Sequence, residues 1–294
     1  MSPTSEIWLI FQREMRKSIR SVKGIILVVL ALLASAVAAL VCIYAESSLR
    51  EKLKITDTQQ LYDLKEQAML KAGYSVEMAH SLASVPFALQ AFLKFTIWMG
   101  PGLVAILGFD SVSADVQHRA VRYWTVRTRR WTYMVGKFLG LWCTVSLVTL
   151  TLNVLAAVAV MIKGYMTPTA FFTWGLRFWI TSALICSAWC SSAIFIIAQI
   201  KTPLIALLVI CFTFFVLWIP GMIGWFMRAN ESIDSDLPFS DMSLKWYEYV
   251  DPNGYDDLLL NPRWSMNLGG LVACLVFWLV FVGGGAALFE RRDV

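Results

Sequence analysis

The segment GIILVVLALLASAVAALVCIY, residues 24–44, carries no charged side chain along its whole length. A helix needs about 20 mostly apolar residues to cross the hydrocarbon core of a bilayer, so this segment predicts a membrane-spanning helix. The composition of the chain agrees: of 294 residues, 58% are hydrophobic and 15% are charged, against roughly a quarter charged in soluble domains. An ordinary soluble fold is therefore not expected.

Five further apolar runs have the length of a membrane-spanning helix. They cover residues 87–109, 138–162, 171–199, 202–227 and 266–289. Because these runs are continuous rather than alternating, they predict helices and not the strands of a β-barrel. We therefore expect an all-α polytopic membrane protein with six transmembrane helices, formed by a single domain over residues 1–294.

The six predicted spans place each connecting segment on one of the two sides of the membrane, and basic residues are distributed unevenly between these sides. The side with the leader, the loop after the second span and the tail carries 14 Lys and Arg against 6 Asp and Glu, while the opposite side carries 9 basic and 14 acidic residues. Loops rich in Lys and Arg stay in the cytoplasm. We expect both termini to be cytoplasmic and residues 45–86 and 228–265 to be external, the former as a helical hairpin.

The leader, residues 1–23, has the pattern of an amphipathic helix at the membrane surface. Its apolar positions are Trp8, Phe11, Met15, Ile19 and Val22, and its basic face carries Arg13, Arg16, Lys17 and Arg20. Two roles stay open for it. It is either a charge anchor that only sets topology or a connecting helix that also packs on a partner.

The loop after the second span, residues 110–133, is rich in arginine. The arginines are Arg119, Arg122, Arg127, Arg129 and Arg130. A guanidinium group suits bidentate pairing with carboxylates of a partner protein, and the same residues also suit binding to anionic lipid. Both interpretations can hold together.

No set of residues in the chain has the spacing of a known catalytic or nucleotide-binding motif. Histidine occurs only as His80 and His118, and HExxH, GxSxG and GxxxxGK[ST] are absent. Cys186 and Cys190 stand one helical turn apart, but two thiols alone make a poor metal site. We therefore expect no enzyme activity, no bound cofactor and no metal in this chain.

Two basic residues, Lys94 and Arg177, fall inside predicted spans. Each stands about 10 Å from the external end of its span, at about 1.5 Å per residue. Snorkelling to the interface explains both residues. The alternative is that they line an outward-facing vestibule that favours an anionic or lipid-like substrate.

The layout resembles that of ABC-2 type transporter permeases of the type V exporter kind, the membrane subunits of bacterial ABC exporters. The leader QREMRKSIRS (12–21) and the ending FERRDV (289–294) are similar to the family's N-terminal helix and basic tail. The segment FDSVSADVQHRAVRYWTVRTRRWTYMVGKFLG (109–140) resembles the family's cytoplasmic coupling loop. In that resemblance Asp115 matches the acidic position, Arg130 the arginine, and Gly136 with Lys137 the closing pair. His118-Arg119 stands where the family has Gly-Thr, and Arg127 where it has Pro.

The resemblance implies a permease in the bacterial inner membrane that works by alternating access. Its partners would be two ABC ATPase subunits, which bind the ATP and Mg, a second copy or a paralogue of the permease, and membrane lipids, with no nucleic acid. The ATPase would dock on the loop through Asp115, Arg119, Arg122, Arg127, Arg129 and Arg130, and near Arg13, Arg16 and Arg20 of the leader helix. The alternative is a membrane scaffold or regulatory subunit that recruits a cytoplasmic partner without transport.

Overall fold

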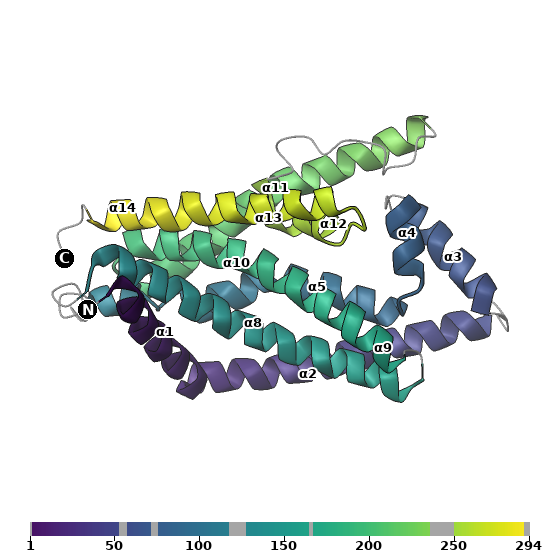
Figure 1. Ribbon diagram of the computed structural model, residues 1–294, viewed down its shortest axis with the longest axis horizontal. Coiled ribbons are helices and arrows are strands. Elements are labelled where there is room, and N and C mark those ends of the chain that lie inside the picture. Colours follow the sequence, from purple (N-terminus) through teal and green to yellow (C-terminus); the bar gives the residue numbers. More distant parts are fainter. Residues whose placement is uncertain are drawn as a thin grey trace.

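Figure 1 shows the computed structural model of the chain, which describes residues 2–52, 58–71, 76–117, 128–164, 167–235 and 250–290. Within these ranges every element is helical and none is a strand. The α-helices are α1 (Pro3–Arg20), α2 (Val22–Lys52), α3 (Thr58–Lys71), α4 (Val76–Ala83), α5 (Phe87–Gly108), α6 (Ser113–Gln117), α8 (Arg130–Ile162), α9 (Pro168–Ala170), α10 (Leu176–Gln199), α11 (Pro203–Ser235), α12 (Tyr255–Leu259), α13 (Trp264–Trp278) and α14 (Gly284–Glu290). A π-helical segment, Phe171–Gly175, precedes α10, a 3-10 turn, Pro252–Gly254, precedes α12, and a second π-helical segment, Leu279–Gly283, joins α13 to α14.

Six helices among the described residues are long and apolar enough to cross a membrane, and they lie where the six apolar runs predict them. They are α2, α5, α8, α10, α11 and the continuous unit of α13 and α14. Three boundaries differ from the expectation by about two helical turns. The helix α2 continues past residue 44 to Lys52, and α11 continues past residue 227 to Ser235. The helix α8 begins at Arg130, before the predicted start at Phe138. These first turns of α8 contain Thr132 and Lys137, whose polar side chains are buried inside the protein rather than facing lipid.

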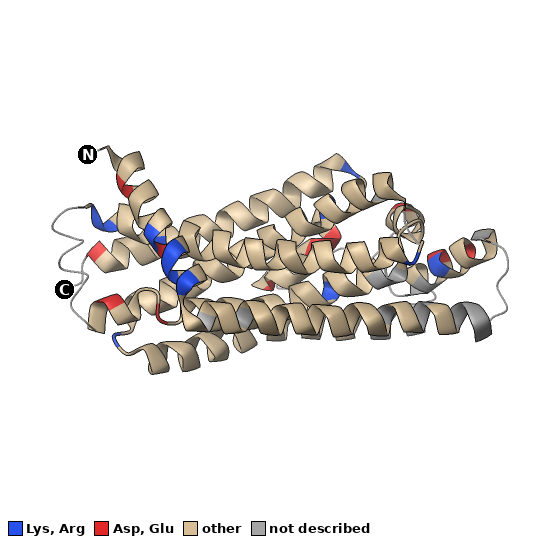
Figure 2. Cartoon of the chain, turned by 90° about the horizontal axis from the view of Figure 1, so that it is seen from below, with Lys and Arg blue, Asp and Glu red and all other residues tan. Residues whose placement is uncertain are grey.

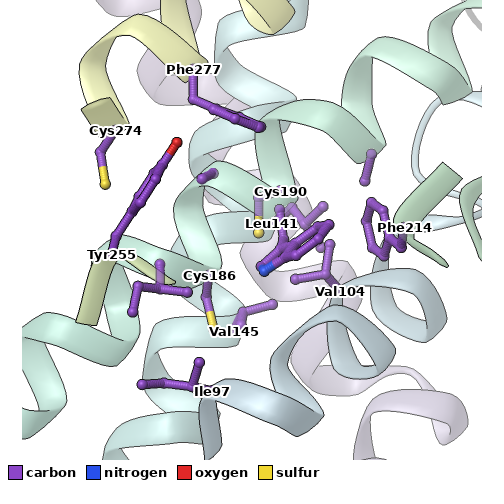
Figure 3. Packing of buried hydrophobic residues seen from close by; sticks show 14 of the residues in the cluster. Ile97, Val104, Leu141, Val145, Cys186, Cys190, Phe214, Tyr255, Cys274 and Phe277 are labelled. Atoms are coloured by element: carbon purple, nitrogen blue, oxygen red, sulfur yellow. The ribbon is translucent and has the colours of Figure 1, made fainter. Parts of the chain in front are cut away.

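The helix α10 forms the centre of the bundle. Most of its residues are buried, and it contacts α5, α8, α11 and α13. Small side chains permit this close packing: the hydroxyls of Ser191 and Ser192 donate to backbone carbonyls of their own helix and so leave no unpaired donor in the core. Figure 3 shows Cys186 and Cys190 of α10 within the same buried cluster as Val145 of α8.

The outer faces of α2, α11 and α13 are apolar and exposed. Val37 of α2, Phe212 of α11 and Val272 of α13 each expose more than half of their surface. Such continuous apolar surfaces are rare on soluble proteins. They fit contact with lipid tails or with other membrane helices.

A sharp bend separates α1 from α2 (Figure 1). Ser21 is extended between the two helices, and its hydroxyl accepts a hydrogen bond from the Gly24 backbone N–H at 2.9 Å. A Cβ atom at Gly24 would overlap the Ser18 carbonyl oxygen, so the bend requires glycine at this position. The apolar run and the amphipathic leader are therefore two separate helices.

Both described ends of the chain lie at one end of the bundle, which we call the α1 end (Figure 1). The short helices α3, α4, α9 and α12 lie toward the opposite, far end. Figure 2 shows that Lys and Arg residues gather on and near α1, while the long middle part of the bundle is largely uncharged. The hairpin expected in residues 45–86 is present as α3 and α4, which are joined by a 2.6 Å hydrogen bond from the Tyr62 hydroxyl to the His80 carbonyl.

Candidate functional site

A buried cluster of charged residues lies at the α1 end, centred on Lys137 of α8. Its ammonium group donates to Glu14 Oε1 of α1 at 2.5 Å, to Asp115 Oδ2 of α6 at 2.6 Å and to the Ser111 carbonyl at 2.6 Å. Tyr133, one turn earlier on α8, donates its hydroxyl to the same Asp115 oxygen at 2.8 Å. All three donors of the ammonium are therefore satisfied.

The cluster is closed to solvent. The Lys137 side chain is only 1% exposed, and Glu14 and Asp115 are 6% and 10% exposed. Removing one partner of a buried ion pair leaves an uncompensated charge, which costs about 3–5 kcal/mol. The three residues thus join α1, α6 and α8 into one unit, and none of them is exposed to a protein partner.

Two glycines of α8 let α1 approach closely enough to make this cluster. A Cβ atom at Gly136 would lie 2.8 Å from Ile10 Cβ, and one at Gly140 would lie 2.6 Å from Glu14 Cβ. Both distances are shorter than side chains tolerate. The Gly136-x-x-x-Gly140 spacing therefore forms a groove of the small-xxx-small kind, and α1 lies in it.

A third face of α1 makes the contact with α8. The leader's pattern of apolar and basic positions did not indicate this face. Glu6, Ile10 and Glu14 follow one another at four-residue spacing and are all buried. The predicted apolar positions Trp8 and Ile19 are instead more than half exposed, as expected for side chains that face lipid.

Glu6 of α1 caps the start of α8. Its Oε2 accepts hydrogen bonds from the Arg129 backbone N–H at 3.2 Å and the Thr132 hydroxyl at 2.8 Å. The Arg129 side chain makes no such cap. Glu6, a residue distant in sequence, instead accepts from one of the free N–H groups and places a carboxylate at the positive end of the helix dipole. The hydrogen bond from Thr132, together with that from Arg129, lowers the pKa of Glu6 below its ordinary value.

Arg130 connects the start of α8 to the end of α14. Its Nη1 donates to the Phe289 carbonyl at 3.3 Å and to the Glu290 carbonyl at 2.8 Å. These are C-terminal carbonyls with no partner inside their own helix, and a cation there also complements the helix dipole. The last helix is therefore held to the same unit as α1 and α6.

Some of the predicted docking residues are bonded within the protein, some are exposed, and some are not described. Asp115 lies in the buried cluster and Arg130 on the end of α14, whereas Arg129 exposes its side chain. Arg13, Arg16 and Arg20 are exposed along α1. Arg119, Arg122 and Arg127 lie outside the described residues.

Lys94 and Arg177, the residues predicted for a vestibule, both contact the segment that contains α12. Lys94 of α5 pairs with Asp256 and lies 3.8 Å from Asp257. Arg177 of α10 donates to the Leu260 and Asn261 carbonyls, each at 3.0 Å, and lies over the Trp174 ring. The two cations therefore anchor α12 to the bundle, and a role in substrate binding stays a prediction.

Asp251 lies just before α12 and is buried against α11. Its carboxylate fills the space beside Gly221 and accepts a hydrogen bond from the Asn253 backbone N–H at 2.9 Å. Burial raises the pKa of Asp251 to about 7, although the Asn253 hydrogen bond acts in the opposite direction. This carboxyl group therefore titrates near neutral pH.

These features define a class: a polytopic helical integral membrane protein with its charged contacts concentrated at the two ends of the bundle. In the described part of the chain, no three side chains of His, Cys, Asp or Glu gather as a metal site would need. No protein-family profile matches the chain, and no curated protein matches it in sequence.

Proposed function

We propose that this chain is the permease subunit of an ATP-binding cassette transporter of the ABC-2 type. It would export a substrate across a bacterial inner membrane by alternating access, with its α1 end in the cytoplasm and ATP and Mg bound by a separate ATPase subunit. The observation that carries the proposal is the Lys137 cluster, because it joins α1 and the start of the loop after α5 to one membrane helix.

A motor protein can drive a membrane domain only through contacts that do not give way under load. Lys137 holds α1 and α6 on α8, Glu6 holds the start of α8, and Arg130 holds the end of α14. A force applied to the loop between α6 and α8 would therefore reach two spans at once. Arg13, Arg16 and Arg20 along α1 would supply exposed donors for carboxylates of the motor.

The exposed apolar faces of α2 and α11 support the second part of the proposal, a permease dimer. A transport path between two copies would need membrane helices whose outer faces pack on a partner or on lipid. Such faces are present on both helices. The partner would be a second copy of this chain or a paralogue.

Co-purification from the native membrane tests the proposal. The detergent-solubilised wild type is compared with a variant that combines Arg127→Glu and Arg129→Glu, while Arg130 is kept because it caps α14. The control combines Lys163→Glu and Lys201→Glu, two exposed positions with the same total change of charge. We expect an ABC-type ATPase to accompany the wild type and the control, to be lost from the loop variant, and to change its hydrolysis rate when the permease is removed.

Other outcomes would contradict the proposal. If no ATPase accompanies any of the three proteins, the transporter interpretation is wrong. If a cytoplasmic protein without ATPase activity is bound by the wild type and lost from the loop variant, the chain is a membrane scaffold or regulatory subunit.

A further inference from the structure

Two cavities adjoin beside the bend between α1 and α2. The larger, of about 330 Å³, lies between the first turns of α2 and the middle of α8, and the smaller, of about 70 Å³, lies next to the Lys137 cluster. Ser18 and Leu107 line both, so the two are direct neighbours with these side chains between them. The volume of the larger cavity is within the roughly 300–1,000 Å³ of ordinary ligand sites.

The larger cavity is apolar along its length. Ile25 and Val28 of α2 face Leu147 and Val148 of α8 across it. The hydroxyl of Thr151, which also lines the cavity, donates to the Leu147 carbonyl of its own helix. The Thr144 hydroxyl likewise donates to the Gly140 carbonyl, so apart from Ser18, which also lines the smaller cavity, the lining suits a hydrocarbon chain.

The smaller cavity is polar and carries both signs of charge. Lys17 provides the cation, and Glu14 and Asp110 provide carboxylates. Ser111 also lines it; the residue is 7% exposed, and its hydroxyl oxygen is buried behind the wall of the cavity. A cavity with charges of both signs suits a ligand that also carries both signs.

The order of the two cavities matches a phospholipid in the leaflet at the α1 end. The polar cavity lies at the level of the basic residues of α1, and the apolar cavity extends from it along α2 toward the middle of the bundle. A headgroup would thus lie at the interface and an acyl chain in the hydrocarbon region. The exposed apolar residues Trp8 and Ile19 of α1 place that helix in the same interfacial layer.

We propose that this pair of cavities binds one phospholipid whose headgroup carries a primary ammonium, such as phosphatidylethanolamine. The ammonium would enter the small cavity and donate to the carboxylates of Glu14 and Asp110, the phosphate would face Lys17, and one acyl chain would occupy the apolar cavity.

Hydrogen bonding and charge separate this lipid from phosphatidylcholine and phosphatidylglycerol. The trimethylammonium group of phosphatidylcholine has no N–H to donate to the carboxylates. An anionic glycerol headgroup would bring a negative charge to the carboxylates of Glu14 and Asp110 without a cation to meet them.

Binding of this lipid would stabilise the docking of α1. The ligand would touch α1, α2, α8 and the turn after α5, and the Ser111 residue that lines its polar end also accepts a hydrogen bond from Lys137 through its carbonyl. A ligand that binds only the folded arrangement stabilises it by mass action. The inference does not depend on the proposed transport function, because lipid binding needs no ATPase.

Native mass spectrometry tests the inference on the full chain. The protein is equilibrated in mixed micelles with equimolar phosphatidylethanolamine, phosphatidylcholine and phosphatidylglycerol of identical acyl chains, and retained lipids are counted. We expect one retained phosphatidylethanolamine, favoured about tenfold over each competitor, which is the effect of one charge-assisted hydrogen bond.

Two variants on one helix distinguish a specific lipid from general solvation. Leu147→Trp fills the apolar cavity, and Leu155→Trp is its control, because both leucines are similarly exposed on α8 at 41% and 40% but Leu155 does not line the cavity. Retention should be lost in the first variant and kept in the second. Asp110→Asn removes one carboxylate from the polar cavity and should weaken the preference for phosphatidylethanolamine.

Three outcomes would overturn the inference. Retained lipids that follow the composition of the mixture would mean only general solvation. A preference for phosphatidylglycerol would mean that the basic residues of α1 select for negative charge alone. A dimer of the chain that is lost in Leu147→Trp would make the groove a protein interface.

Discussion

The Lys137 ammonium lies 2.5 Å from the Glu14 carboxylate, although the two residues are 123 positions apart in sequence. This pair holds the amphipathic helix α1 against α8, and Asp115 completes the cluster at 2.6 Å. Four predictions follow. Three concern Lys137, Gly140 and Arg130 at the α1 end, and the fourth concerns Asp251, which precedes α12.

Replacing the buried cation should destabilise the protein strongly. Lys137→Met leaves two buried carboxylates without their partner, so we expect a loss of about 3–5 kcal/mol in the free energy of unfolding. Thermal unfolding in a single detergent measures the change. Lys163→Met, an exposed lysine at the end of α8, is the control and should leave the melting temperature unchanged.

A second variant tests whether the instability of Lys137→Met comes from unpaired charge or from lost packing. Combining Lys137→Met with Glu14→Gln and Asp115→Asn leaves no unpaired charge, so much of the lost stability should return. If the triple variant is as unstable as Lys137→Met alone, packing rather than the ion pairs explains the effect.

A methyl group at Gly140 should push α1 away from α8. The added Cβ would lie 2.6 Å from Glu14 Cβ, and overpacking of this kind costs about 1–3 kcal/mol. Hydrogen exchange should show lower protection of α1 amides in Gly140→Ala. Gly269→Ala on α13, where no atom lies within 4 Å of the new methyl group, should keep α1 protected; equal protection in both variants would contradict a close helix contact.

Loss of the Arg130 guanidinium should loosen the end of α14. Arg130→Gln removes the charged donor from the Phe289 and Glu290 carbonyls, so the last turn of α14 should exchange its amide hydrogens faster, by several-fold for a loss of about 1 kcal/mol. Arg129→Gln changes an exposed neighbour and should leave this turn unaffected. The prediction is wrong if the two variants exchange alike.

Asp251 should make stability depend on pH between about 4 and 7. Its pKa is raised from 3.8 to about 7 by burial, so the folded state binds the proton more tightly than the unfolded state. Stability should therefore fall as pH rises through this range and level off above it, by at most about 4 kcal/mol at about 1.4 kcal/mol per pH unit.

The Asp251→Asn variant tests this titration. It keeps an oxygen for the Asn253 N–H but carries no charge, so it should melt at a higher temperature than the wild type at pH 8 and at a similar one at pH 4. Melting curves from pH 4 to pH 8 measure the difference. Parallel curves for the two proteins would show that Asp251 does not titrate in this range.

Much of the fold was predictable because lipid imposes simple rules on a sequence. The six apolar runs correspond to six membrane-length helices, and the hairpin of α3 and α4 is present in the polar segment between the first two. The start of α8 was predicted too late. On a hydropathy scale Thr132 and Lys137 are polar and are expected to face water. Both are buried, because α1 and α6 supply hydrogen-bond partners for them.

The candidate site was predictable only in part. The resemblance singled out Asp115, Arg130 and the Gly136-Lys137 pair, and the structure places all four where helices meet. Glu6, Glu14 and Tyr133 were missed, since each looks like an ordinary surface or interfacial residue in sequence. The four-residue spacing of Glu6, Ile10 and Glu14, together with Gly136-x-x-x-Gly140, was the available signal for a helix contact.

By itself the sequence determined that this protein is embedded in a membrane and where six helices can cross it. These properties follow from the transfer of each residue between water and lipid, which needs no knowledge of neighbours. Only the tertiary structure decided which charges are buried together and which helices they join. Those outcomes depend on donors and acceptors meeting within about 3 Å, as Lys137 meets Glu14 and Asp115, and no local pattern encodes that distance.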